Sequence, residues 1–184
     1  MRISFAWLLS AALLPGLAAC SSSTAPAADA GVLMQSGFEE SLGWNDANPA
    51  LFSADKAHSG HVAAVVSPQV EYSATYARTL EQLGLGGGAH RLELSGWVLR
   101  TAAGSTARLV VQVDASPTDQ TKVYYATLPV ASAVPTFGEW KQVSLPVELP
   151  AAAQGPNRLK VYLWNEQGTS PTYLDDVTLR RLDK

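Results

Sequence analysis

The chain has 184 residues, with 13 Lys and Arg against 16 Asp and Glu, so its formal net charge is -3. This balance argues against a nucleic-acid-binding protein, which normally meets phosphates with a basic face. Hydrophobic residues make up 47% of the chain and charged residues 16%, which is enough apolar material to bury a core. The single cysteine excludes a disulfide framework within the chain and a multi-cysteine metal cluster.

The amino-terminal end has the features of a secretory signal. One positive charge, at Arg2, is followed by an uncharged apolar run from Ile3 to Leu14. This run is too short for a membrane-spanning helix, which needs about 20 apolar residues. The small residues that follow it are typical of a cleavage site, so we expect residues 1–19 to be a signal peptide.

The last residues of this segment, Leu17-Ala18-Ala19-Cys20, resemble the lipobox of bacterial lipoproteins. The resemblance implies that Cys20 is lipidated after residues 1–19 are removed; the alternative is an ordinary signal peptide with an unmodified cysteine. Residues 20–31, rich in Ser, Ala and Pro, are expected to form a flexible tether. Because Ser21 follows the cysteine, resemblance to Gram-negative lipoproteins implies an outer-membrane anchor, on the periplasmic face or the cell surface.

Residues 32–184 are expected to form one all-β domain. No sustained helical periodicity is visible there, and short alternating runs are separated by Gly, Pro, Asn and Asp. The expected strands are Leu33–Glu39, Ala50–Ala54, Val62–Ser67, Val70–Thr79, Arg91–Thr101, Ala107–Asp114, Lys122–Pro129, Trp140–Glu148, Leu159–Asn165 and Thr172–Leu182. Many short strands at this spacing predict a two-sheet antiparallel sandwich.

Alternation divides three of these strands into two faces, since successive side chains point to opposite sides of a strand. The aliphatic faces carry Leu159, Val161, Leu163, Leu92, Leu94, Val98, Leu109, Val111 and Val113. The opposite faces carry Lys160, Tyr162, Trp164, Glu93, Ser95, Trp97, Arg108, Gln112 and Asp114. The same rule places Tyr72 and Tyr76 together on one face, as core residues or as the floor of a groove.

A water-facing surface of this composition fits a sugar ligand. Aromatic rings can stack on the apolar C–H faces of pyranoses, and polar side chains can bind the hydroxyls. The candidate carbohydrate-binding residues are Trp164, Tyr162 and Trp97 for stacking, with Glu93, Arg108 and Gln112 for the hydroxyls. Trp97 has a second interpretation, in which it seals the edge of a sheet.

A set of short segments between Val32 and Leu182 carries a family resemblance. The segments are Gly37-Phe38-Glu39, Trp44, Ala57-His58-Ser59-Gly60, Leu92-Glu93-Leu94-Ser95-Gly96-Trp97-Val98, Glu139-Trp140-Lys141-Gln142-Val143 and Tyr173-Leu174-Asp175-Asp176-Val177-Thr178-Leu179. In this order they resemble carbohydrate-binding modules of the family 4/9 type. The resemblance implies an all-β, two-sheet antiparallel jelly-roll sandwich of the galactose-binding type.

The resemblance also implies a structural calcium ion between the first and last strands, away from the sugar. Glu39 and Asp176 occupy the matching positions, with Asp175 as the alternative carboxylate, and backbone carbonyls near Gly37 and His58 could complete the shell. Ca²⁺ takes 6–8 oxygen ligands, so few carboxylates suffice when carbonyls contribute. The alternative is that these acids sit at strand ends in water or accept turn hydrogen bonds.

Little in the sequence supports catalysis. There is no Gly-x-Ser-x-Gly turn, and the three histidines are expected in loops, so no nucleophile-and-base arrangement is indicated. The sequence therefore predicts a membrane-anchored lipoprotein whose non-catalytic domain binds a polysaccharide or glycan. The alternative is a structural or assembly lipoprotein that uses the sandwich face to bind a protein partner.

Overall fold

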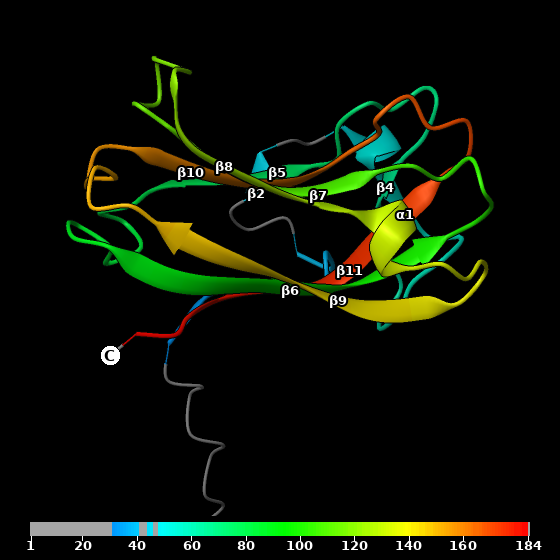
Figure 1. Cartoon of the computed structure of the whole chain (residues 1–184). Helices are drawn as coiled ribbons and strands as arrows, with labels where there is room; N and C mark the ends of the chain where they lie inside the picture. Colours follow the sequence, from blue (N-terminus) through cyan, green and yellow to red (C-terminus); the bar gives the residue numbers. More distant parts are fainter. Residues whose placement is uncertain (1–30, 41–43, 46–47, 184) are drawn as a thin grey trace, which may run out of the picture. The chain divides into compact units, whose positions relative to one another are not determined.

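The computed structural model describes residues 31–40, 44–45 and 48–183. Within them, two antiparallel sheets lie face to face as the layers of a sandwich (Figure 1). In the sheet that we call the β6 sheet, the strand order is β3 (Phe52–Ser53), β4 (Ala63–Val66), β11 (Thr172–Arg181), β6 (His90–Arg100) and β9 (Trp140–Leu149), and β1 (Val32–Ser36) also pairs with β11. In the other, the β10 sheet, the order is β2 (Trp44–Asn45), β5 (Thr75–Thr79), β10 (Arg158–Trp164), β7 (Arg108–Asp114) and β8 (Lys122–Pro129).

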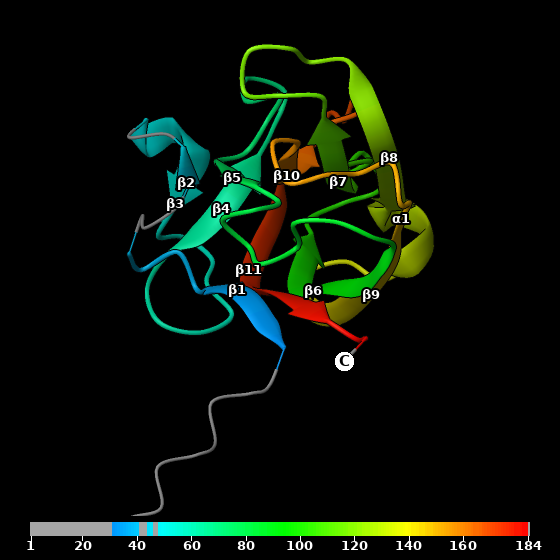
Figure 2. The same ribbon diagram turned by 90° about the vertical axis from the view of Figure 1, so that its left-hand side faces the viewer.

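Most neighbouring strands are distant in the sequence, so the sheets are assembled by crossovers between the two layers (Figure 2). The predicted all-β jelly-roll sandwich is confirmed. Three short elements were not predicted: β2, the 3-10 helix η1 (Pro49–Leu51) and the helix α1 (Val130–Ala133). Each has at most four residues, which is too short for a periodic pattern to reveal it. No helix of the described part is long and apolar enough to cross a membrane.

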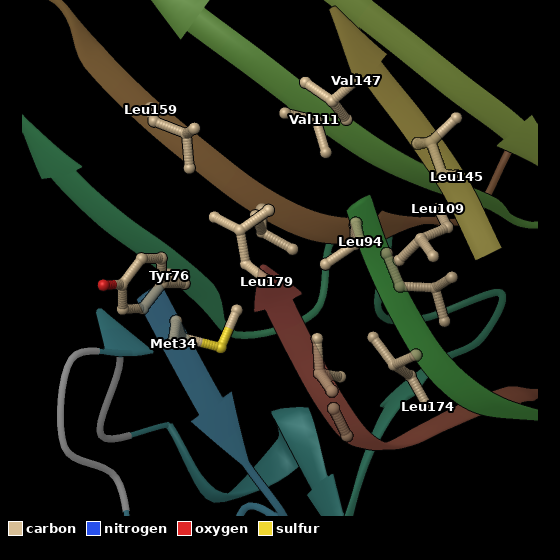
Figure 3. Packing of buried hydrophobic residues seen from close by; sticks show 14 of the residues in the cluster. Met34, Tyr76, Leu94, Leu109, Val111, Leu145, Val147, Leu159, Leu174 and Leu179 are labelled. Atoms are coloured by element: carbon tan, nitrogen blue, oxygen red, sulfur yellow. The ribbon is translucent and has the colours of Figure 1, made fainter. Parts of the chain in front are cut away.

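The core fills the space between the two sheets with aliphatic side chains from both layers (Figure 3). Leu159, Val161 and Leu163 of β10 are fully buried, as the alternation predicts. They form one cluster with residues such as Leu94 and Leu179 of the β6 sheet. The transfer of each such side chain from water to the core contributes about 1.5–3 kcal/mol to the stability of the fold. Because these residues face inward, their neighbours Lys160, Tyr162 and Trp164 face the outer surface.

One predicted strand differs in a way that matters for the site. Residues Val70–Thr79 were expected to form a regular strand, but β5 begins only at Thr75. Tyr76 pairs with Val161, and Tyr72 pairs with Trp164. The segment leading into β5 therefore advances by four residues where β10 advances by three, so it contains one extra residue. One extra residue reverses the facing of everything beyond it. The prediction that Tyr72 and Tyr76 share a face is therefore wrong: Tyr76 is buried in the core and Tyr72 is exposed.

Candidate functional site

Aromatic side chains gather on the outer surface of the β10 sheet. The Tyr72 ring lies parallel to Trp164, with the centroids 6.4 Å apart and an interplanar angle of 9°. Tyr162 meets Tyr72 edge-on, at 5.9 Å and 67°. The Trp164 indole N–H donates to Glu71 Oε1 at 3.3 Å, which orients the ring. Since 48% of Tyr72 is exposed, this cluster presents aromatic surface to the solvent rather than to the core.

A chain of polar contacts holds the centre of the same surface. The Tyr162 hydroxyl donates to Gln112 Oε1 at 2.9 Å, and Gln112 Nε2 donates to Asp114 Oδ1 at 2.5 Å. Lys160 Nζ forms an ion pair with Asp114 Oδ2 at 2.5 Å. Burial, followed by the charges of nearby groups, raises the pKa of Tyr162, so its phenol stays protonated and continues to donate. These bonds fix the side chains before a ligand arrives, which lowers the entropy cost of binding.

Beside the aromatic cluster lies a recess of about 350 Å³. It is lined by Tyr72, Thr75, Gln112, Gln120, Lys122, Lys160 and Tyr162. These side chains supply aromatic faces, amides, hydroxyls and two ammonium groups. Ligand sites in proteins begin at about 300 Å³, so the recess is large enough to receive part of a small organic ligand.

Four of the six predicted carbohydrate-binding residues meet on this surface. Trp164 and Tyr162 come from β10, and Gln112 and Arg108 from the adjacent β7, where Trp164 is the registered partner of Arg108. Gln112 is largely buried beneath Tyr162, so its amide acts as a support for that ring. The Arg108 guanidinium is bound through Nε to Glu166 Oε2 at 2.6 Å, which places it beside the aromatic cluster and outside the recess lining.

The remaining two, Trp97 and Glu93, lie elsewhere. Both belong to β6 and therefore to the other sheet, so they do not share the surface that carries Trp164 and Tyr162. Trp97 stacks on the His58 ring at 3.8 Å and 14°, and Glu93 Oε2 accepts a hydrogen bond from Ser144 Oγ at 2.9 Å. Alternation shows which side of a strand a residue occupies, but it does not show to which sheet the strand belongs.

Three residues of the surface were not assigned to it from the sequence: Tyr72, which the alternation leaves open between the core and the floor of a groove, Lys122 and Tyr125. The signal for Tyr72 was hidden by the extra residue before β5. In β8, Tyr124 pairs with Val113 but Lys122 pairs with Asp114, so one residue is again inserted. This irregularity brings Lys122 and Tyr125 to the same side, where the Lys122 ammonium lies 4.6 Å from the centre of the Tyr125 ring. A regular strand would point them in opposite directions.

No protein-family model matches this sequence, and no curated protein sequence is significantly similar to it. Solved structures are similar in fold. A xylan-binding family 22 carbohydrate-binding module of Paenibacillus barcinonensis Xyn10C has a TM-score of 0.53 and 20% identity, over 86% of this chain and 99% of that one. A tandem of two such modules from the same protein has a TM-score of 0.57 and 18% identity, over 86% of this chain and 51% of that one. The C-terminal family 22 module of Clostridium thermocellum Xyn10B has a TM-score of 0.53 and 16% identity, over 82% of this chain and 93% of that one.

The chain has the fold of these carbohydrate-binding modules. At 16–20% identity the likeness establishes the sandwich and nothing finer. The three structures are named as family 22 modules, so the expected resemblance to family 4/9 stays a prediction at that level.

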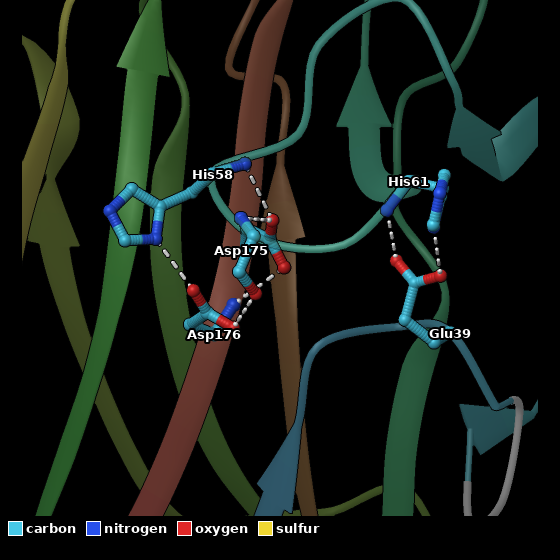
Figure 4. Close-up of polar contacts among 6 residues, drawn as sticks. Glu39, His58, His61, Asp175 and Asp176 are labelled. Atoms are coloured by element: carbon cyan, nitrogen blue, oxygen red, sulfur yellow. Dashed lines mark hydrogen bonds and ion pairs between the residues drawn. The ribbon is translucent and has the colours of Figure 1, made fainter.

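The residues predicted to hold calcium form two separate clusters (Figure 4). Glu39 Oε1 accepts the backbone N–H groups of His61 at 2.7 Å and Val62 at 2.8 Å, and these bonds are the main reason why the Glu39 pKa is lowered. Asp175 and Asp176 instead bind the loop at His58, which comes before β4.

In the second cluster every carboxylate oxygen has a donor. Asp175 Oδ2 accepts the backbone N–H groups of His58 at 2.7 Å and Ser59 at 3.2 Å, and Oδ1 accepts the N–H of Asp176 at 2.7 Å. Asp176 Oδ2 contacts His58 Nδ1 at 2.6 Å, and its Oδ1 accepts the Ser59 hydroxyl at 2.7 Å. Burial raises the Asp175 pKa, and the hydrogen bonds to its oxygens oppose that shift.

This donor set does not fit a calcium ion as it stands, because N–H and O–H groups already occupy the oxygens that the ion would need. Within the described ranges, no three His, Cys, Asp or Glu side chains converge as a metal site. The geometry agrees with the alternative from the sequence, in which these acids accept turn hydrogen bonds. The family resemblance thus predicts a bound calcium ion, whereas this geometry predicts that the carboxylates hold none unless they rearrange.

Thermal unfolding tests the calcium prediction directly. From the hydrogen bonds at Asp175 and Asp176, we expect the same melting temperature in EDTA and in excess Ca²⁺. An ion that binds only the folded state would add RT ln(1 + [L]/Kd) to its stability and raise that temperature. A rise in Ca²⁺ that Glu39→Gln and Asp176→Asn abolish would show that the ion rearranges these carboxylates. Excess Mg²⁺ is the control: if it raises the melting temperature as much as Ca²⁺ does, the effect is a general one of divalent salt.

Proposed function

We propose that the outer surface of the β10 sheet binds a polysaccharide or glycan and does not cleave it. The observation that carries the proposal is the aromatic cluster beside a polar recess, in which Tyr72 is exposed and Tyr162 and Trp164 are half-buried. Aromatic rings of this kind match the apolar faces of sugar rings, while the amides and ammonium groups of the recess match hydroxyls. The shared fold with modules named as xylan-binding domains supports the proposal.

The lining of the recess favours binding over hydrolysis. Cleavage of a glycosidic bond normally needs two carboxylic acids on either side of it. None of the described residues that line the recess is an acid. The neighbouring Asp114 is fully buried and bound to Lys160 and Gln112, so it is not positioned to approach a substrate.

A glycan array probed with the purified full-length chain tests this function. We expect retention on one or more polysaccharides, confirmed by isothermal titration with no release of reducing sugar ends over hours. A folded protein that binds no glycan would overturn the proposal. Co-purification of a stoichiometric protein partner under the same conditions would then favour the structural or assembly lipoprotein.

We also propose that the domain is anchored to the outer membrane through Cys20, which lies outside the described residues. The support is the lipobox-like segment that ends at Cys20 and the Ser21 that follows. Acyl chains at about 0.8 kcal/mol per buried CH₂ hold a protein firmly on a bilayer when more than one is attached. Cys20→Ser is expected to move the protein from the membrane fraction to the soluble fraction. Ser22→Ala is the control that keeps the cysteine, and a Cys20→Ser protein that survives a carbonate wash in the membrane fraction would disprove the anchor.

A further inference from the structure

The charged side chains that line the recess on the β10 sheet are all positive. Its lining includes the ammonium groups of Lys122 and Lys160 and no carboxylate among the described residues. The chain as a whole has a formal net charge of -3, so a basic recess is not a consequence of its composition. The charge of the recess therefore comes from where the fold places these two lysines.

The two lysines differ in how their charge is compensated. Lys160 is paired with Asp114, whose side chain is fully buried, so the two together are neutral. Lys122 is exposed, and within the part of the chain that the structure describes it takes part in none of the ion pairs. Its ammonium lies over the face of Tyr125, 4.6 Å from the ring centre. A cation held on an aromatic face keeps its full charge and its capacity to donate hydrogen bonds.

Strand pairing places this charge next to the proposed sugar-stacking surface. Gln112 of β7 is the registered partner of Lys160 on one side and of Tyr125 on the other. Lys122 stands over the Tyr125 end of this row, and Tyr162 follows Lys160 two residues along β10. Tyr72 and Tyr162 line the same recess as Lys122. A sugar ring stacked on the tyrosines would thus present its substituents toward the Lys122 ammonium.

We propose that the ligand of this recess is an acidic glycan, in which an anionic substituent on a sugar binds the Lys122 ammonium. The inference rests on the proposed carbohydrate-binding function and narrows it to a substrate class. The carboxylate of a uronic acid or a sulfate ester would supply the anion. A hydrogen bond between charged partners is about twice as strong as a neutral one, so the anion would make a large contribution to affinity.

Matched pairs of polymers test the charge requirement. Glucuronoxylan and polygalacturonate are each compared with their carboxyl-reduced forms, which keep the sugar chain and lose the negative charge. Dextran sulfate and dextran form the corresponding pair for the sulfate ester. With the full-length chain we expect an acidic polymer to bind about tenfold more tightly than its neutral partner. The preference should shrink as NaCl is raised from about 20 mM to about 300 mM, because salt screens exposed charges.

Two lysine variants with the same change in net charge locate the effect. Lys122→Gln is expected to bring the affinity for the acidic polymer down to that for the neutral one, and Lys122→Arg to retain most of the preference. Lys141→Gln is the matched control, because Lys141 lies on β9 in the β6 sheet and is paired there with Glu139. It should bind both polymers as the unaltered protein does. An acidic preference that Lys122→Gln removes and Lys141→Gln keeps supports the proposal.

Three results would overturn it. Equal binding of acidic and neutral polymers would refute the charge requirement and leave the carbohydrate-binding function intact. An equal loss in the Lys122→Gln and Lys141→Gln variants would show a general effect of net charge instead of a site. Binding to neither form of any polymer, together with an empty glycan array, would remove the proposed function and this inference with it.

Discussion

Trp164→Ala is expected to weaken glycan binding at least about fivefold while the domain stays folded. The substitution removes an aromatic contact on the order of 1 kcal/mol or more, and 1.4 kcal/mol corresponds to a factor of ten. Trp164 is partly exposed and stacks on Tyr72 at the outer surface, so its loss leaves the core untouched. Isothermal titration with a glycan identified on the array measures the effect, and thermal unfolding shows whether the fold is retained.

The neighbouring residue provides the matched control. Leu163 is fully buried on the opposite side of the same strand, in the core between the sheets. Leu163→Ala should leave a cavity and cost about 2–5 kcal/mol of unfolding free energy. Its glycan affinity, measured at a temperature where the variant is folded, should stay close to that of the unaltered protein. A Trp164→Ala protein that unfolds, beside a stable Leu163→Ala protein, would mean that the two faces of β10 are reversed.

Lys160→Met is expected to destabilise the domain by on the order of 3 kcal/mol, because it leaves a buried carboxylate without its counter-charge. The Asp114 side chain has no exposed surface, and that of Lys160 is 18% exposed. Gln112 Nε2 would remain as a donor to Asp114, but one neutral donor does not replace an ammonium. Urea unfolding of the two proteins measures the difference.

Two further variants separate the buried charge from other effects of losing a lysine. Lys141→Met breaks an exposed ion pair with Glu139 and should cost less than about 1 kcal/mol. Adding Asp114→Asn to Lys160→Met removes the unpaired charge, and an asparagine can still accept from Gln112, so most of the stability should return. Equal unfolding curves for Lys160→Met and Lys141→Met would show that the domain does not depend on the buried pair.

Much of the fold is determined by the sequence, because burial imposes a strict period of two on a strand with one face in the core. Leu159, Val161 and Leu163 are apolar at every second position, and the structure buries all three. The same rule assigned the outward direction of Tyr162 and Trp164, and thereby two of the three rings of the aromatic cluster. These assignments need only local information, since the side of a strand is set by the chain's own pleat.

The rest of the candidate site depends on pairing between distant segments. Only the tertiary structure placed Trp97 and Glu93 in a different sheet from Trp164, because β6 and β10 have equivalent patterns and are sorted by their partner strands. It also decided that Tyr72 and Lys122 face the recess. Each stands beyond an inserted residue, which is visible only when the register of two paired strands is compared. One inserted residue reverses the facing of the side chains beyond it, and a period counted along a single strand contains no sign of the insertion.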